Sequence, residues 1–213
     1  MEVSKCRILS HKAGFLVKPN NNPHFGWDGG SPGIQIIGQV RSVFRLFYTA
    51  LLFFLAAPLL FGAALISPGM RRKAVKMTAR ILCTGAGIRI NRRGSPPKPP
   101  FIFISNHQSW LDSVIFAAEL GAVFVSQKRI AEWPVIGTVL KMTGTVFIDR
   151  SSLRDIGNVS SGMSLALSKG EGVVFFPEAD TSKGPGTKPF RPALLEGAVH
   201  RGEGVQWGTI SYK

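Results

Sequence analysis

The stretch Phe101–Asp112 (FIFISNHQSWLD) decides the fold of this chain, because it joins an apolar run directly to a cluster of polar side chains. The run Phe101–Ser105 follows a segment rich in Pro and Gly and has a polar exit, a pattern typical of a buried strand. A helix is expected over Ser109–Leu120, where Gly121 follows as a stop signal. The polar cluster therefore lies where a strand ends and a helix begins, which is where open α/β sheets bind their ligands.

Within this stretch, His107 and Asp112 form a candidate catalytic pair. A neutral imidazole can accept a proton from a hydroxyl, and a carboxylate can orient the ring and stabilise the imidazolium that forms. A separation of five positions is not a same-face spacing on a helix, so the chain must bend if the two side chains are to touch. A plainer alternative stays open, in which Asn106 or Ser109 caps the helix, His107 lies on the surface and Asp112 is solvated.

Strands and helices alternate along the rest of the chain. Further strands are expected at 122–126, 145–148, 172–176 and 205–212, and further helices at 133–143, 153–168 and 189–200. Such alternation predicts an α/β fold with a largely parallel sheet and flanking helices.

The N-terminal part of the chain has a different character. Residues 1–40 are rich in Asn, Gly and Pro and lack a sustained apolar period, so we expect a disordered arm. Residues 41–84 are expected to form a membrane-embedded or interfacial helical anchor. Their uncharged run Leu46–Ile66 is long enough to cross a bilayer, which takes about 20 residues. Because Pro58 and Gly62 interrupt it, a spanning helix, a kinked hairpin in one leaflet and a buried core helix all remain open.

Positive charge is concentrated beside this apolar run. The chain has a formal net charge of +14, and no acidic residue occurs between Asp28 and Asp112. Nucleic acid is one conceivable partner for a basic chain, but cations flanking an apolar run favour attachment to anionic membrane lipid. Residues 70–84 repeat apolar side chains at helical spacing with cations between them, which predicts an interfacial helix, and a short strand is expected at 88–90.

Four blocks of sequence, in this order, resemble the glycerolipid acyltransferase family, whose best-known members are the 1-acyl-glycerol-3-phosphate acyltransferases. They are NHQSWLD at 106–112, GTVFIDR at 144–150, VVFFPE at 173–178 and GVQWGTISY at 204–212. The resemblance runs from about residue 71 to the end of the chain and implies an acyltransferase domain over 85–213. Two cysteines and four histidines show neither a disulfide framework nor metal-ligand spacing, so no metal or other cofactor is expected.

The resemblance implies transfer of a fatty acyl group from acyl-CoA or acyl-carrier protein to the hydroxyl of a lysophospholipid, most directly 1-acyl-glycerol-3-phosphate. His107 would be the general base and Asp112 would orient it, with the substrate hydroxyl in place of a triad Ser and no covalent acyl-enzyme. Ser109 is the alternative nucleophile. Backbone N–H groups at the helix start after His107 are expected to suit an oxyanion or a phosphate. Family members are commonly membrane-bound with a cytoplasmic active site, so the expected partners are membrane lipid, lysolipid and acyl donor, without nucleic acid.

Five residues are candidates for substrate binding: Asn106, Lys128, Lys141, Arg150 and Glu178. The guanidinium of Arg150 suits bidentate contact with a phosphate of the acceptor or of the donor, although a surface ion pair is the alternative. For Lys128 and Lys141, a position on a solvated surface is an equally good explanation.

The chain departs from the family pattern at residues 176–182, where the usual FPEGTRS reads FPEADTS. Thr181 replaces the Arg that the resemblance assigns to the glycerol phosphate, and Asp180 would repel an anion. Relatives with Thr at this position include some that acylate lyso-ornithine lipid. Such a lysolipid is therefore the alternative acceptor, and an inactive membrane-bound relative is the other alternative. Family members usually continue beyond the last block, so the domain is expected to be C-terminally short.

Overall fold

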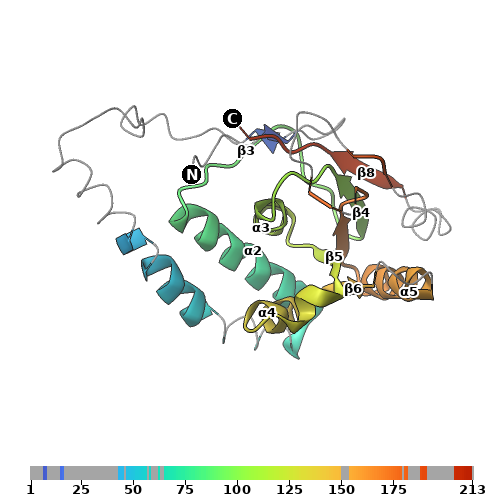
Figure 1. The fold of residues 1–213 in the computed structure, drawn as a ribbon, viewed down its shortest axis with the longest axis horizontal. Helices are drawn as coiled ribbons and strands as arrows, with labels where there is room; N and C mark the ends of the chain where they lie inside the picture. The colour runs from blue at the N-terminus through green and yellow to red at the C-terminus, as the bar shows by residue number, and fades with distance from the viewer. Residues whose placement is uncertain are drawn as a thin grey trace.

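A five-stranded parallel sheet forms the centre of the protein (Figure 1). The computed structural model describes residues 7–8, 15–16, 43–45, 47–56, 58, 62, 65–149, 154–178, 180–181, 188–190 and 204–212. The strands are β4 (Phe101–Ser105), β5 (Val123–Gln127), β6 (Val146–Ile148), β7 (Gly172–Phe175) and β8 (Val205–Gly208). They lie in the order β6-β5-β7-β4-β8, and each neighbouring pair is parallel.

Helices cover both faces of this sheet. They are α2 (Pro68–Gly85), α3 (Leu111–Leu120), α4 (Ile136–Met142) and α5 (Arg154–Ser168), with a 3-10 helix η1 at Lys128–Glu132. Side chains of β4 alternate between the faces, as the pleat of a strand requires. Phe101 and Phe103 pack toward α2 and α3, while Ile102 packs toward α5. The predicted α/β class, with a largely parallel sheet and flanking helices, is confirmed.

The helix α2 belongs to the core of the domain. Its first turn is closed by the Ser67 hydroxyl, which accepts a hydrogen bond from the N–H of Met70 at 3.2 Å, and Pro68 occupies the first turn, where it is tolerated. One face of α2 is buried, and its Ala79 and Cys83 join the same apolar cluster as Phe103. The amphipathic pattern predicted the helix, but the burial of this face against α3 was not predicted from it.

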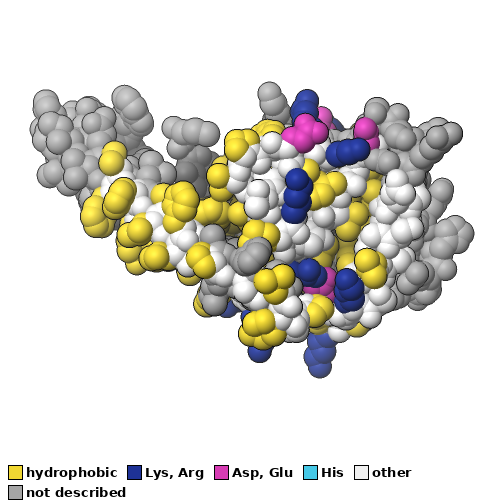
Figure 2. Space-filling model, turned by 90° about the horizontal axis from the view of Figure 1, so that it is seen from below, with side chains coloured by type: hydrophobic (Ala, Val, Ile, Leu, Met, Phe, Trp, Pro, Cys, Tyr) yellow, Lys and Arg dark blue, Asp and Glu magenta, His cyan; other side chains and the backbone are white. Residues whose placement is uncertain are grey.

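A helical stretch at 43–45 and 47–56 precedes α2 and runs beside it (Figure 1). The two approach closely where the Thr49 side chain leaves no room for a side chain on Gly85. Large apolar side chains of this stretch are exposed, including Phe44, Phe47 and Phe54, and yellow surface gathers there at the left of Figure 2. Within the part of the chain that is described, no helix has both the length and the apolar character to cross a bilayer.

Little of residues 1–40 is described. Two short strands, β1 (Arg7–Ile8) and β2 (Phe15–Leu16), pair with each other and with β3 (Asn91–Arg92). The rest of the predicted arm lies outside the described residues. The predicted domain limits at 40/41 and 84/85 stay predictions.

Two predicted elements are wrong in position. The strand expected at 88–90 is displaced to β3, because Ile88 and Ile90 pack on the core without pairing in a sheet. The helix expected at 133–143 begins only at Ile136. Trp133 is held extended before a proline and Val135 has a φ of 64°, so neither can continue a helix. The helix expected at 189–200 falls almost wholly outside the described residues.

Candidate active site

The candidate site lies where β4 and β7 end side by side. The two strands pair in register, with Ile104 opposite Phe175, so the residues that follow them emerge at the same edge of the sheet. His107 follows β4 and Phe176 follows β7, and their rings stack with centroids 4.1 Å apart and planes 11° apart. This is the carboxyl edge of a parallel sheet, the general location of ligand sites in such folds.

The structure brings His107 and Asp112 into contact. Nδ1 of the imidazole lies 3.0 Å from Oδ2 of the carboxylate, and Asp112 is fully buried. The same oxygen accepts hydrogen bonds from the backbone N–H groups of Gln108 at 2.6 Å and Ser109 at 2.9 Å. These hydrogen bonds therefore stabilise the bend of the chain that a contact between residues five positions apart requires. With Nδ1–H donated to Asp112, the basic lone pair of the neutral ring is on Nε2.

A third side chain completes this arrangement. The hydroxyl of Tyr212 donates a hydrogen bond to Oδ1 of Asp112, across 100 positions of sequence. Both carboxylate oxygens thus have donors, as a buried charge requires. Sequence reasoning included Tyr212 in the last family block but assigned it no role. The sequence spacing of two residues that are 100 positions apart does not predict that they touch.

Asn106 and Glu178 have backbone partners. The Asn106 amide donates to the carbonyl of Ile210 at 2.9 Å and accepts from its N–H at 2.7 Å, which ties β4 to the segment that carries Tyr212. Glu178 is 4% exposed and accepts from the N–H of His107 at 3.0 Å and of Lys188 at 2.9 Å. Both side chains hold the loops around His107 in place. Their direct contact with substrate stays a prediction.

The expectation of free N–H groups just after His107 is wrong at Gln108, Ser109 and Leu111. The N–H groups of Gln108 and Ser109 are taken by Asp112, and that of Leu111 points to the Ser109 hydroxyl at 3.3 Å. The carboxylate of Asp112 thus occupies a position that an oxyanion would have needed. The Ser109 hydroxyl has the local capping contact that was the alternative to a nucleophile.

The cationic candidates are less closely connected to the site. Lys128 begins η1 and Lys141 lies in the last turn of α4, and both are exposed. None of the contacts found among the described residues joins either lysine to His107. Arg150 lies outside the described residues, so its predicted phosphate contact remains a prediction.

The buried thiol of Cys83 is not a competing nucleophile. Burial, with a contribution from the charge of Glu119, raises its pKa to about 12. A thiol with this pKa is almost wholly protonated at neutral pH, and the thiolate is the reactive form. Among the described residues, the dyad of His107 and Asp112 is therefore the arrangement best suited to proton transfer.

Comparison with known proteins identifies the family. The family model described as Acyltransferase matches residues 88–209, more than half of the chain, and this chain belongs to that family. It is 35% identical over 148 residues to the 1-acyl-sn-glycerol-3-phosphate acyltransferase of Neisseria meningitidis, covering 68% of this chain and 58% of that protein. The lyso-ornithine lipid O-acyltransferase of Pseudomonas aeruginosa is 28% identical over 144 residues, covering 68% and 55%. The chain thus spans little more than half the length of these relatives.

A solved structure supports the fold. The crystal structure of the 1-acyl-sn-glycerophosphate acyltransferase of Thermotoga maritima superposes with a TM-score of 0.60 at 15% sequence identity, covering 83% of this chain and 85% of that one. The agreement extends to a mostly parallel sheet with flanking helices.

Proposed function

We propose that this protein is an acyltransferase that moves a fatty acyl group from a thioester, acyl-CoA or acyl-carrier protein, to the free hydroxyl of a lysophospholipid. The most direct version converts 1-acyl-glycerol-3-phosphate to phosphatidic acid. The observation that carries the proposal is the contact between His107 and the buried Asp112 at the carboxyl edge of the sheet. The names of the relatives support the class of acceptor.

The chemistry follows from the dyad. Nε2 of His107 takes the proton of the acceptor hydroxyl while that oxygen attacks the thioester carbonyl. Asp112 stabilises the imidazolium, and collapse of the tetrahedral intermediate breaks the carbon–sulfur bond. The leaving thiolate takes the proton from the imidazolium, so the base is regenerated without an acyl-enzyme. Acceptor and donor are both substrates, and no further cofactor enters the scheme.

Membrane location is part of the proposal. The exposed apolar side chains of residues 43–56 and the cations of α2 support attachment to a lipid surface, where both substrates have their acyl chains. We place the active site on the cytoplasmic face, since the acyl thioesters are formed there.

A second acceptor is favoured by one observation. The Asp180 carboxylate, 71% exposed, lies just after Glu178 and pairs only loosely with Lys188, at 3.9 Å. A negative charge beside the site disfavours a phosphate monoester relative to a lysolipid without one, such as lyso-ornithine lipid.

The test is an acceptor panel. Membranes containing the protein receive labelled acyl-CoA or acyl-carrier protein together with 1-acyl-glycerol-3-phosphate, lyso-ornithine lipid or lysophosphatidylcholine. We expect transfer to one of the first two, and the preferred acceptor decides between the two candidates. No transfer to any lysolipid by the folded protein would favour the inactive relative.

His107→Ala should lower kcat/KM by about 10³-fold, because a positioned general base contributes about 10²–10⁴. Ser109→Ala is the matched control, since it removes the alternative nucleophile and leaves the dyad intact. Equal loss of activity in both variants would contradict direct transfer.

A further inference from the structure

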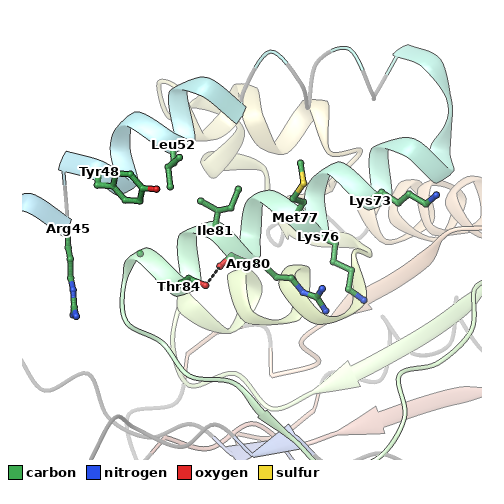
Figure 3. A pocket seen from close by; sticks show the side chains of 10 residues that line it. Arg45, Tyr48, Leu52, Lys73, Lys76, Met77, Arg80, Ile81 and Thr84 are labelled. Carbon is green, nitrogen blue, oxygen red and sulfur yellow. Dashed lines mark hydrogen bonds between the residues drawn. The ribbon is translucent and has the colours of Figure 1, made fainter. Parts of the chain in front are cut away.

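A groove lies between the N-terminal helical stretch and α2. Neither His107 nor Asp112 is among the described residues that line it. It encloses about 700 Å³, within the range of ligand-sized cavities. Tyr48 and Leu52 line it from one side and Met77 and Ile81 from the other. Figure 3 shows Met77 and Ile81 pointing from α2 toward the stretch that carries Leu52. This strip of four side chains suits an acyl chain.

Cations line the same groove beside this apolar strip. The charged residues that line the groove are Arg45, Lys73, Lys76 and Arg80. No acidic side chain occurs among the described residues that line it. In Figure 3, Lys76 and Arg80 extend from the same flank of α2. The Nε of Arg80 donates to the carbonyl of Ala118 at 3.1 Å, which holds the guanidinium at the end of α3.

The positive charge of this flank is incompletely balanced. The acidic group that raises the pKa of Lys76 is Glu119, which already pairs with Arg92 at 3.3 Å. Burial lowers the pKa of Lys76, and the neighbouring Arg80 lowers it further. An anion beside Lys76 and Arg80 would offset this repulsion.

We propose that the groove binds one anionic phospholipid of the membrane, separately from the catalytic site. Its acyl chain lies along Leu52, Met77 and Ile81, and its phosphate contacts Lys76 and Arg80. The match of one apolar strip to one cationic flank favours a single amphipathic molecule over free phosphate or a zwitterionic lipid. The proposal concerns binding and does not depend on the proposed acyl transfer.

The test is calorimetric titration of the full chain in neutral detergent with dioctanoyl phosphatidylglycerol, which is neither acceptor nor product of the proposed reaction. We expect saturable binding of one lipid per chain, with much weaker binding of dioctanoyl phosphatidylcholine and of inorganic phosphate. Equal affinity for the two lipids, or no saturable binding, would overturn the proposal.

Paired variants separate the groove from general surface charge. Lys76→Gln with Arg80→Gln should weaken phosphatidylglycerol binding about 10- to 30-fold, because each cation near an anionic lipid contributes about 1 kcal/mol. Arg93→Gln with Lys98→Gln removes the same charge from exposed positions outside the groove and should leave affinity unchanged. An equal loss in both pairs would mean diffuse attraction and would overturn the site.

A third variant fills the groove without changing its charge. Met77→Trp should abolish saturable binding, because the larger side chain occupies the space of the acyl chain. Met77 is 46% exposed, so the added bulk has room outside the core and the fold is retained. Unchanged affinity in folded Met77→Trp would also contradict the proposal, whereas His107→Ala should bind the lipid normally.

Discussion

Asp112 is the residue on which the candidate site depends most. Its buried carboxylate is held by two backbone N–H groups, by Tyr212 and by His107, so its charge is compensated without a cation. Charge-assisted hydrogen bonds of this kind keep a carboxylate in place and fix the tautomer of the imidazole. The same side chain shapes the loop and orients the imidazole of His107.

Asp112→Asn should lower kcat by about 10³-fold or more with the loop largely retained, because an amide cannot stabilise the imidazolium and favours the wrong tautomer. The rate of acyl transfer is measured in membranes, with circular dichroism as a check on folding. Glu132→Gln makes the same change of charge at an exposed position and should retain activity. Activity near the parent level in Asp112→Asn would remove Asp112 from the mechanism.

Tyr212→Phe should act through Asp112. Loss of the hydroxyl takes one donor from a buried carboxylate, which costs about 1–3 kcal/mol of unfolding free energy. We expect kcat to fall about tenfold with KM little changed, since the Tyr212 hydroxyl bonds Asp112 and would act on the rate through the dyad. Tyr48→Phe makes the same chemical change in the N-terminal stretch, so an equal fall of kcat there would argue against positioning.

At the scale of elements, patterns of apolar residues predicted most of the strands and helices. The strand at 101–105 matches β4, and the helix at 153–168 matches α5 to within one residue. Errors occurred where local backbone restrictions outweighed the pattern, as at Trp133 and Val135, or where apolar residues packed without sheet pairing, as at Ile88. Both depend on neighbours that periodicity does not reveal.

The helix α2 contains a polar group that tertiary packing leaves unsatisfied. The Thr78 hydroxyl is buried and has no hydrogen-bond partner among the described residues. Thr78→Val should therefore raise the unfolding free energy by about 1 kcal/mol, because it replaces the hydroxyl with a methyl of similar shape.

Thermal unfolding checks this prediction. Thr84→Val is the control on the same helix, because the Thr84 hydroxyl is exposed and already donates to the carbonyl of Arg80 at 2.9 Å. A lower melting temperature for Thr78→Val than for Thr84→Val would show that the Thr78 hydroxyl is satisfied in solution.

At the scale of the whole molecule, one ion pair joins α2 to the sheet. Arg71 pairs with Glu171 just before β7, and the Glu171 side chain is 6% exposed. The guanidinium of Arg71 also packs on Gly144, next to β6, where a Cβ would lie only 3.0 Å from it. This contact holds α2 against the segments that lead into β6 and β7.

Glu171→Gln should lower the unfolding free energy by about 3 kcal/mol, because it leaves the partly buried Arg71 without its counter-charge. Chemical denaturation measures the change. Arg71→Met combined with Glu171→Met should recover much of the loss, since replacing both members of a buried pair by apolar groups is often neutral. Additive losses in the double variant would show that the two side chains do not act as a pair.

The sequence by itself determined the parallel α/β fold, the membership of the acyltransferase family and the choice of His107 and Asp112, because these follow from local periodicity and short motifs. Only the tertiary structure decided that Tyr212 and Ile210 support the dyad and that α2 is a core helix. It also decided that the N–H groups expected to bind an oxyanion donate to Asp112 instead. Those features arise where segments distant in the chain meet. Their geometry depends on strand order and register, which no local pattern encodes.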